Sequence, residues 1–486
     1  MKSGKYVLLV LVLAFSLGIS GCLQQAPQQE KTPTTSPPVV VETTPRETTP
    51  PATTPEVTTT PPPATTPEQK PLEYGGVINI GYTGPLSGIA QPYGEAVFAG
   101  LSFAAEDIND AGGIVLGEKY YKLKVVGLDD MYLPSAAAQN AEKLFKEKNT
   151  PIVFCSHSGG ILEIEKINEK YGFIVGAFTT DPRVLKTGDK MIVMYPPNFE
   201  LIYVPHLSDY FLARGATKAA MLNGTHEYAV AWGAAFKEYW KLKGGEIVAE
   251  VPLDYYLTTD YTDAVAKALA KKPDVILLAG PSKPVAGIIK TARMMGYTGG
   301  FIVAEQAKLE EIMYYLGIKY DFAKNTVIEG NISLIKKVVG TTAPCSIALT
   351  PIAAVDPNTP GYIEACKRFS ARLGDTPITW EHVLSYQALF VIAKAMEKAG
   401  TTNATKIMEA LEKETFPADG YKGFPKFIYS AMFRIYPYGT IGAFNTPGNM
   451  MSIDENGVAT FSPGLTPKFW GQEYAYTDSE GKIIWG

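Results

Sequence analysis

Short apolar runs alternate with longer amphipathic segments along most of the chain, and no other feature restricts the fold as much. The runs are typical of buried strands, and the segments of about 10–15 residues between them are typical of helices. The expected strands are 77–82, 122–128, 152–155, 173–178, 218–222, 247–252, 275–279 and 301–305. The expected helices are 93–110, 135–148, 161–171, 201–213, 229–243, 261–271 and 285–295. Such βαβ units form mostly parallel sheets, so the sequence predicts an α/β fold.

The alternation stops at Pro196-Pro197 and then starts again. Residues 76–486 are also too many for one typical core, so we expect two doubly wound lobes joined by hinge strands. Lobe 1 is expected to comprise 76–197 plus about 331–440, and lobe 2 to comprise 198–330 plus about 441–486. Ligands of such sheets bind beyond the carboxyl ends of the strands.

The N-terminal sequence is typical of a secretion signal. Lys2 and Lys5 precede an apolar stretch from Tyr6 to Ile19, which is shorter than the ~20 residues of a membrane span. The sequence Ile19-Ser20-Gly21-Cys22 resembles a lipobox, so we expect residues 1–21 to be removed and the Cys22 sulfur to carry a lipid. An ordinary signal peptide that happens to contain a cysteine is the alternative. Either interpretation predicts an extracytoplasmic protein, and the lipobox predicts an anchor on the outer face of the cytoplasmic membrane.

Residues 22–75 form a spacer between this anchor and the lobes. From Thr32 to Pro67, 25 of 36 residues are Thr or Pro, a composition that has little to bury and favours disorder. Prolines favour an extended chain, which makes the segment a stalk. The stalk is interpreted either as a tether for docking onto a membrane partner or as a spacer across a surface layer.

Composition excludes several classes of function. The formal net charge is −5 and no basic block is present, which argues against nucleic-acid binding. Beyond Cys22 the cysteines are Cys155, Cys345 and Cys366, so at most one internal disulfide can form, with Cys345–Cys366 as one possibility. Their spacing is not that of a metal site, and no GxSxG, Walker A or HExxH motif occurs. We therefore expect neither an enzyme nor a cofactor.

Small, hydroxyl and glycine residues follow the expected strands. They occur in "INIGYTGPLSGIAQPYGEAVFAGLSFAAEDINDAGGI", "VVGLDD", "FCSHSGG", "TTDPRVL", "DYTDAVAKALAKKPDVILLAG", "KTARMMGYTGGFIVAEQ" and "SYQALFVIAKAMEKAG". In this order the segments resemble the type I periplasmic binding proteins, specifically the leucine/isoleucine/valine-binding branch that serves ABC importers. The resemblance covers nearly all of 76–415. It implies a Venus-flytrap fold that closes on a ligand between its lobes.

The resemblance also implies roles for individual residues. Ser156 aligns with the serine that binds the ligand α-carboxylate, and Ser158 is a further ligand-binding candidate. Thr179 and Thr180 offer a carbonyl and a hydroxyl that meet carboxylate and ammonium. Glu305 aligns with the acid that pairs with the ammonium.

Two aromatic residues, Tyr93 and Tyr228, align with positions that cover the ligand side chain. Physical arguments support the roles expected for Ser156 and Glu305. Backbone N–H groups before a helix favour an anion, and a buried ammonium needs a charged or carbonyl partner. The alternatives are helix capping for Ser156 and Thr180, a solvated loop acid for Glu305 and ordinary packing for Tyr93 and Tyr228. His157 is expected at the rim of the cleft rather than as a base.

The chain departs from its relatives at several points. Tyr132 stands where the resemblance implies the disulfide partner of Cys155, so we expect a free Cys155. Lys283 is a cation near the expected cleft, and it either meets a second ligand carboxylate or lies on the surface. The aromatic-rich segment 421–451 either shapes a different pocket or packs between the lobes.

These features together predict a monomeric lipoprotein that captures a small amino acid, most plausibly of the branched-chain type, and delivers it to an ABC importer permease. The lipid is expected to be its one attachment to the membrane. An aromatic carboxylate or a short amide or urea is the alternative ligand. A sensory or adhesive surface module is the alternative of another class.

Overall fold

The computed structural model describes residues 72–196, 199–200, 203–321, 326–341, 368–374, 376 and 378–413, and the backbone of six short strands between 432 and 484. The expected signal peptide, Cys22, Cys345 and Cys366 lie outside the described residues, as does most of the segment 421–451. The stalk expected over 22–75 also lies outside them up to residue 71, but its last residues, 73–75, belong to the strand Glu73–Gly84 instead.

The first lobe is built on an eight-stranded sheet. Its strand order is β2 (Ile114–Leu116), β3 (Lys119–Asp129), β1 (Glu73–Gly84), β4 (Ile152–Cys155), β5 (Ile174–Ala177), β6 (Ile192–Met194), β15 (Ile441–Phe444) and β14 (Met432–Ile435). The central strands from β3 to β15 pair in parallel, and the strand at each edge is antiparallel to its neighbour.

The second lobe is built on a seven-stranded sheet. Its strand order is β8 (Glu246–Leu253), β7 (Lys218–Gly224), β9 (Val275–Ala279), β10 (Gly300–Val303), β13 (Val338–Thr341), β16 (Met450–Ile453) and β17 (Ala459–Ser462). Two strand pairs lie outside the large sheets: β11 (Lys319–Asp321) with β12 (Thr326–Glu329), and β18 (Tyr476–Thr477) with β19 (Ile483–Ile484).

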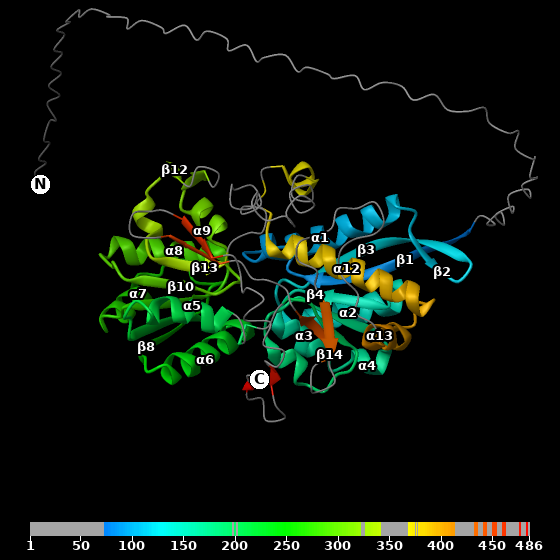
Figure 1. The fold of residues 1–486 in the computed structure, drawn as a ribbon, viewed down its shortest axis with the longest axis horizontal. Helices are drawn as coiled ribbons and strands as arrows, with labels where there is room; N and C mark the ends of the chain where they lie inside the picture. Colours follow the sequence, from blue (N-terminus) through cyan, green and yellow to red (C-terminus); the bar gives the residue numbers. More distant parts are fainter. Residues whose placement is uncertain are drawn as a thin grey trace, which may run out of the picture. The chain divides into compact units, whose positions relative to one another are not determined.

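Helices cover both faces of each sheet (Figure 1). Those of the first lobe are α1 (Gln91–Asp110), α2 (Pro134–Lys148), α3 (Ser158–Ile164), α4 (Asn168–Tyr171), η1 (Pro182–Leu185), α12 (Trp380–Ala399) and α13 (Ala404–Lys413). Those of the second lobe are α5 (Tyr203–Leu212), α6 (Glu227–Leu242), α7 (Thr262–Leu269), α8 (Ser282–Met294), α9 (Leu309–Tyr315) and η2 (Ile332–Ile335). None of the helices in the described part of the chain is long and apolar enough to cross a membrane.

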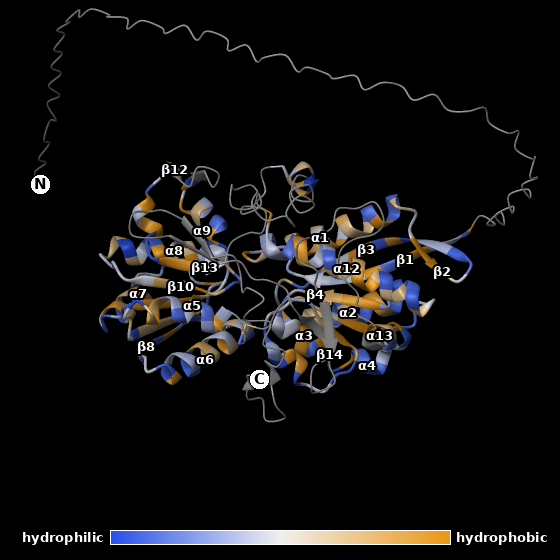
Figure 2. Ribbon diagram, in the orientation of Figure 1, coloured by the Kyte–Doolittle hydropathy of each residue, from blue (hydrophilic) through white to orange (hydrophobic). Residues whose placement is uncertain are grey.

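Side-chain alternation along the strands divides each core into two layers. In β4, Ile152 and Phe154 join the cluster under α1 and α12, while Val153 and Cys155 join the cluster under α2 and α3. Figure 2 shows hydrophobic residues gathered along the strands and on the helix faces that pack against them. Because both faces are covered, the central strands β4, β5, β9 and β10 are apolar throughout, as is typical of parallel sheets.

Helix α12 belongs to the first lobe although it comes late in the sequence, after the second lobe's strands β7 to β13. It lies beside α1 (Figure 1) and is buried on nearly every side, as expected of a core helix. Tyr386 donates a 2.6 Å hydrogen bond to Asp107 Oδ2 of α1, and Gly100 lets the two backbones approach. The site described below uses the first turn of α12.

The expected α/β class, the two lobes and the listed strands are confirmed, with ends that differ by a few residues. The expected helix 161–171 is wrong, because it divides into α3 and α4. Between them the bonds Lys166 N–H to Glu163 O and Ile167 N–H to Ile164 O tighten the turn, and Asn168 reaches inward to Asp189 Oδ2 at 2.8 Å.

The strand pairing also departs from the expected division of the chain. Val338–Thr341 pairs within the second sheet, although 331–440 was assigned to lobe 1. Ile441–Phe444 pairs within the first sheet, although 441–486 was assigned to lobe 2. The chain therefore crosses between the sheets after β6, after β13 and after β15.

Candidate functional site

A cavity of about 40 Å³ lies where the carboxyl ends of strands from both sheets meet. It is lined by Tyr93, Tyr132, His157, Ser158, Phe178, Thr179, Thr180, Pro196, Tyr203, Tyr228, Glu305, Gln306, Trp380, Glu381 and Leu384. A water needs roughly 10–15 Å³, so this cavity holds a few waters. An amino acid can enter only when the lobes separate.

Six of the seven residues expected in the site line this cavity: Tyr93, Ser158, Thr179, Thr180, Tyr228 and Glu305. Ser156 is the exception. It is fully buried, and its hydroxyl lies 3.0 Å from the Tyr82 hydroxyl. Its contact with a ligand stays a prediction.

Glu305 is the best-anchored polar group of the cavity. It follows β10, and Oε1 accepts hydrogen bonds from the Tyr228 hydroxyl at 2.7 Å and from the Thr180 hydroxyl, while Oε2 accepts from Trp232 Nε1 at 2.8 Å. Burial raises the pKa of this carboxyl, and the three donors act in the opposite direction. Three donors thus hold the Glu305 carboxyl group in place, where its oxygens can accept from an ammonium group of a ligand.

Hydroxyl groups of the first lobe also line the cavity. Ser158 Oγ and Thr179 Oγ1 are 2.8 Å apart, and Thr179 Oγ1 also accepts from the Asp181 N–H at 3.2 Å. The Thr180 hydroxyl is already used by Glu305, and its carbonyl accepts from the Phe199 N–H at 2.9 Å. Ser158 and Thr179 are therefore the better placed of the expected groups to donate to a ligand anion.

Aromatic rings form most of the remaining wall. Tyr93 meets Phe178 edge to face with ring centroids 5.9 Å apart, and Tyr203 and Trp380 complete the surface. Such walls provide apolar contact for a ligand side chain.

Polar contacts between four pairs of described residues help to hold the lobes together around the cavity. Gln306 Nε2 donates to the Tyr132 hydroxyl at 3.2 Å, and Thr180 donates to Glu305. Arg183, beside Asp181, reaches Oε2 of Glu227 at 3.1 Å and the Glu227 carbonyl at 2.8 Å. The fourth contact is an ion pair between Lys308 and Glu381. The structure therefore shows the cleft between the lobes in its closed state.

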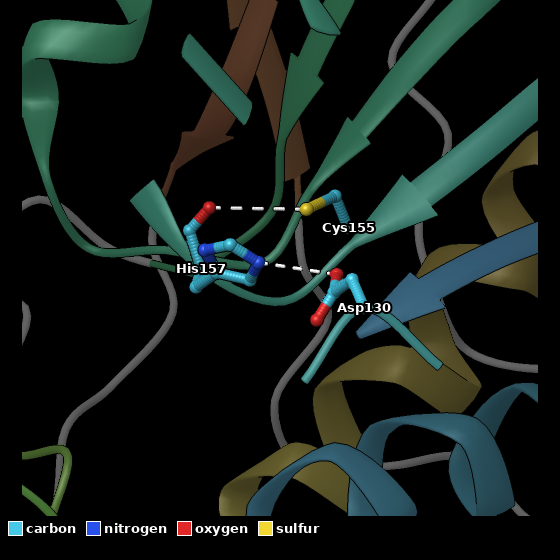
Figure 3. A group of neighbouring side chains, drawn as sticks. All are labelled: Asp130, Cys155 and His157. Atoms are coloured by element: carbon cyan, nitrogen blue, oxygen red, sulfur yellow. Dashed lines mark hydrogen bonds and ion pairs between the residues drawn. The ribbon is translucent and has the colours of Figure 1, made fainter. Parts of the chain in front are cut away.

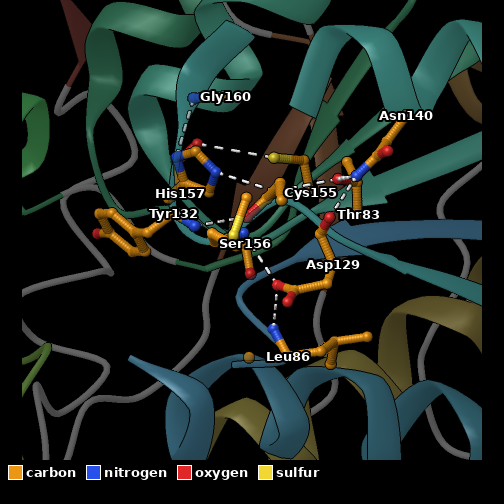
Figure 4. A network of polar contacts seen from close by, with 12 residues as sticks. Thr83, Leu86, Asp129, Tyr132, Asn140, Cys155, Ser156, His157 and Gly160 are labelled. Atoms are coloured by element: carbon orange, nitrogen blue, oxygen red, sulfur yellow. Dashed lines mark hydrogen bonds and ion pairs between the residues drawn. The ribbon is translucent and has the colours of Figure 1, made fainter. Parts of the chain in front are cut away.

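The loop after β3 is bent to bring Tyr132 into the cavity. Met131 and Tyr132 have φ values of 53° and 64°, which non-glycine residues adopt at a cost of about 1–2 kcal/mol each. Asp129 Oδ1 accepts from the Met131 N–H and Asp130 Oδ1 from the Tyr132 N–H, both at 2.9 Å. Figure 4 shows this network, in which Thr83 and Asn140 also take part.

Asp130, Cys155 and His157 lie close together beneath the cavity (Figure 3), with potential metal-ligand atoms within 4.8 Å of one another. His157 caps α3 by accepting from the Gly160 N–H at Nδ1, so Nε2 carries the proton and donates to Asp130 Oδ2 at 3.1 Å. Burial raises the pKa of the Cys155 thiol, which disfavours the thiolate that a metal binds. The geometry fits a hydrogen-bonded support for the loop better than a metal centre. His157, expected at the rim, is buried and lines the cavity.

Sequence reasoning missed several lining residues. Phe178 was adjacent to the expected Thr179, and its position at the end of β5 was a usable signal. Trp380, Glu381 and Leu384 stand at the start of a helix that is buried on nearly all sides. The apolar run Ala388–Ala393 further along this helix was the available signal of such burial. Lys283 is exposed and lines a second cavity instead of this one.

The profile of the family described as Periplasmic binding protein matches residues 77–432, which is more than half of the chain. The chain belongs to this family. An amino acid binding protein of Pseudomonas aeruginosa is 28% identical over 242 residues, which are 48% of this chain and 62% of that protein. The leucine-, isoleucine-, valine-, threonine-, and alanine-binding protein of the same organism is 24% identical over 342 residues, or 70% of this chain and 83% of that protein. This periplasmic binding protein thus spans less than two thirds of the first relative.

Solved structures of other periplasmic binding proteins share the fold. A leucine-binding protein of Thermotoga maritima has a TM-score of 0.63 at 21% identity, and covers 80% of this chain and 99% of its own. A branched-chain amino acid transporter substrate-binding protein of Streptococcus pneumoniae, in complex with isoleucine, has a TM-score of 0.61 at 20% identity, with coverages of 79% and 99%. The fold is the type I periplasmic-binding-protein fold.

Proposed function

We propose that this protein captures an amino acid between its two lobes and delivers it to an ABC importer. The carrying observation is that one cavity is lined both by the anchored Glu305 carboxyl group and by the Ser158 and Thr179 hydroxyls. A zwitterion is complementary to this arrangement, with its ammonium at Glu305 and its carboxylate toward the hydroxyls. The names of the relatives support an amino acid as the ligand.

Ligand binding and lobe closure are coupled in this proposal. A ligand that contacts both Glu305 and Ser158 binds the closed state better than the open one, and so shifts the population toward closure. The closed form then docks onto the permease. The names of two solved relatives support the branched-chain specificity expected from the sequence, whereas the cavity walls favour a different side chain, as argued in the next subsection.

The test is calorimetric titration of the full-length protein in detergent with the standard amino acids. At least one should bind, and Glu305→Gln should weaken it by at least ~100-fold, because breaking a buried pair costs about 3–5 kcal/mol. The matched control is Glu118→Gln on the exposed turn after β2, which should leave affinity unchanged. Equal affinity of Glu305→Gln and native protein would refute the role of Glu305, and absence of any amino-acid binding would refute the function.

We also propose that the protein is held at the outer face of the cytoplasmic membrane by a lipid on Cys22. The support is the short apolar stretch that ends at Cys22 and the long Thr/Pro-rich segment that follows. Cys22→Ser should abolish incorporation of a labelled fatty acid and release the protein from the membrane fraction. Retention of the label by the variant would contradict the proposal.

A further inference from the structure

A second cavity of about 30 Å³ adjoins the ligand cavity, and charged and polar side chains form part of its wall. The two cavities share three wall residues, Tyr93, Gln306 and Glu381. Further polar side chains line the second cavity alone: Ser282, Lys283, Lys308, Glu311 and Thr379. A ligand side chain that extends past Tyr93 therefore comes near charged and polar groups as well as apolar ones.

The polar character comes from a buried ion pair. Lys308 is 2% and Glu381 is 3% exposed, and the Lys308 ammonium donates to Oε1 of Glu381. Lys308 Nζ also donates to the Gln306 carbonyl at 3.1 Å and lies 5.7 Å from the centre of the Tyr93 ring. Burying both charges is costly unless they have good partners. Placing an aliphatic ligand side chain beside the pair is therefore unfavourable, because such a side chain offers neither charge a partner.

None of the other described titratable groups near the pair offers Glu381 a second positive charge. Glu311 accepts from the Ser282 hydroxyl, and burial raises the pKa of its carboxyl. His382, which follows Glu381, is engaged through Nδ1 with Thr379, and burial lowers its pKa to about 3, so it is neutral at pH 7. Lys283 is exposed to solvent.

The positions of Lys308 and Glu381 in the two cavity walls determine which of them a ligand contacts. Glu381 lines both cavities, whereas Lys308 lines the second cavity and not the first. A carboxylate has about four acceptor sites, and the hydrogen bond from Lys308 goes to one oxygen, so Glu381 keeps acceptor capacity. A group that arrives from the ligand cavity thus meets an acceptor.

We propose that Glu381 binds the distal end of the ligand side chain, so that the substrate is an amino acid whose side chain ends in a hydroxyl, amide or ammonium donor rather than in methyl groups. This inference rests on the proposed function. A donor satisfies the carboxylate, whereas a methyl group would displace water from it and return no hydrogen bond. Glu381 and Lys308 are then specificity-determining residues.

The test compares ligands of similar size that differ in the donor: threonine with valine, asparagine with leucine, and lysine with norleucine. Titration of the full-length protein in detergent should show that the donor-bearing member of the best-binding pair binds roughly 10- to 100-fold more tightly. Glu381→Gln should reduce this ratio. Because that variant leaves Lys308 buried without a counter-charge, the double variant Lys308→Met with Glu381→Leu is also needed.

The double variant removes both charges and should fold, as circular dichroism would check. Its donor-to-aliphatic ratio should fall to about one or reverse, while Glu118→Gln keeps the native ratio. Tighter binding of valine and leucine by the native protein, or an unchanged ratio in the folded double variant, would overturn the inference. If aliphatic ligands bind and Glu305→Gln abolishes their binding, only this inference fails. If no amino acid binds, the proposed function fails and the inference falls with it.

Discussion

The ring of Tyr132 lies over the imidazole of His157, with ring centroids 4.5 Å apart and planes inclined by 23°. The resemblance to known binding proteins implied a cysteine at position 132, paired with Cys155. Cys155 is instead a buried free thiol, as expected. The stacked rings join the loop after β3 to the loop after β4, and so serve in place of a covalent tie.

Replacement of Tyr132 separates the stacking from the hydrogen bond. Tyr132→Phe keeps the ring and loses the bond from Gln306, so the free energy of unfolding should fall by about 1 kcal/mol. Tyr132→Ala loses both, and should cost about 3 kcal/mol or more. Urea unfolding monitored by circular dichroism measures both changes. Equal losses in the two variants would show that the stacking contributes nothing.

His226 should make stability depend on pH. Burial lowers its pKa to about 4, below the ordinary value of 6.5, and its Nε2 lies 3.2 Å from Gln306 Oε1. As the pH falls from 6.5 to 4, the unfolded chain gains a proton at His226 that the folded protein does not, so stability is lost through that window. The loss is about 3 kcal/mol, since each pKa unit corresponds to about 1.4 kcal/mol. His226→Gln should reduce the difference between urea midpoints at pH 7 and pH 4, while buried His382 with its pKa of about 3 maintains the remainder, and an unchanged difference would contradict this.

The salt bridge between Arg183 and Glu227 should stabilise the closed state of the lobes only weakly. Both side chains are partly exposed, at 36% and 54%, so Glu227→Gln should change the affinity for the best amino-acid ligand by less than about fivefold. Raising the salt concentration should erase the change. Glu250→Gln is the matched control, because its partner Lys237 lies in the same lobe. A salt-independent effect, or an equal effect of the control, would argue against a contribution to closure.

Gly100 should tolerate no side chain. A Cβ atom there would lie 2.3 Å from the His382 carbonyl oxygen of α12. Gly100→Ala should therefore lower the free energy of unfolding by about 1–3 kcal/mol, as overpacking does. Ser102→Ala on the same helix loses a hydrogen bond to Phe98 O and should cost about 1 kcal/mol or less. Thermal unfolding of both variants tests this, and a native-like Gly100→Ala would mean that α12 shifts freely.

Local patterns predicted the parts of the protein that local physics determines. Long apolar runs gave the central strands, and the position of Glu305 just past one of them placed it correctly in the cavity. The pair Lys308–Glu381 could not be predicted in this way, because 73 residues separate its members and neither lies in a distinctive motif. Strands of four residues such as β13 and β15 carry too little pattern to reveal which sheet they join.

The contact of Tyr386 with Asp107 has a consequence for biosynthesis. The two residues are 279 positions apart, so a ribosome that adds about 5–20 residues per second makes Asp107 roughly 15–55 s before Tyr386. Throughout that interval α1 lacks the helix that covers it, and the first lobe cannot finish its core. For a chain proposed to be exported, the order of its segments thus keeps the first lobe incomplete until α12 has been synthesised.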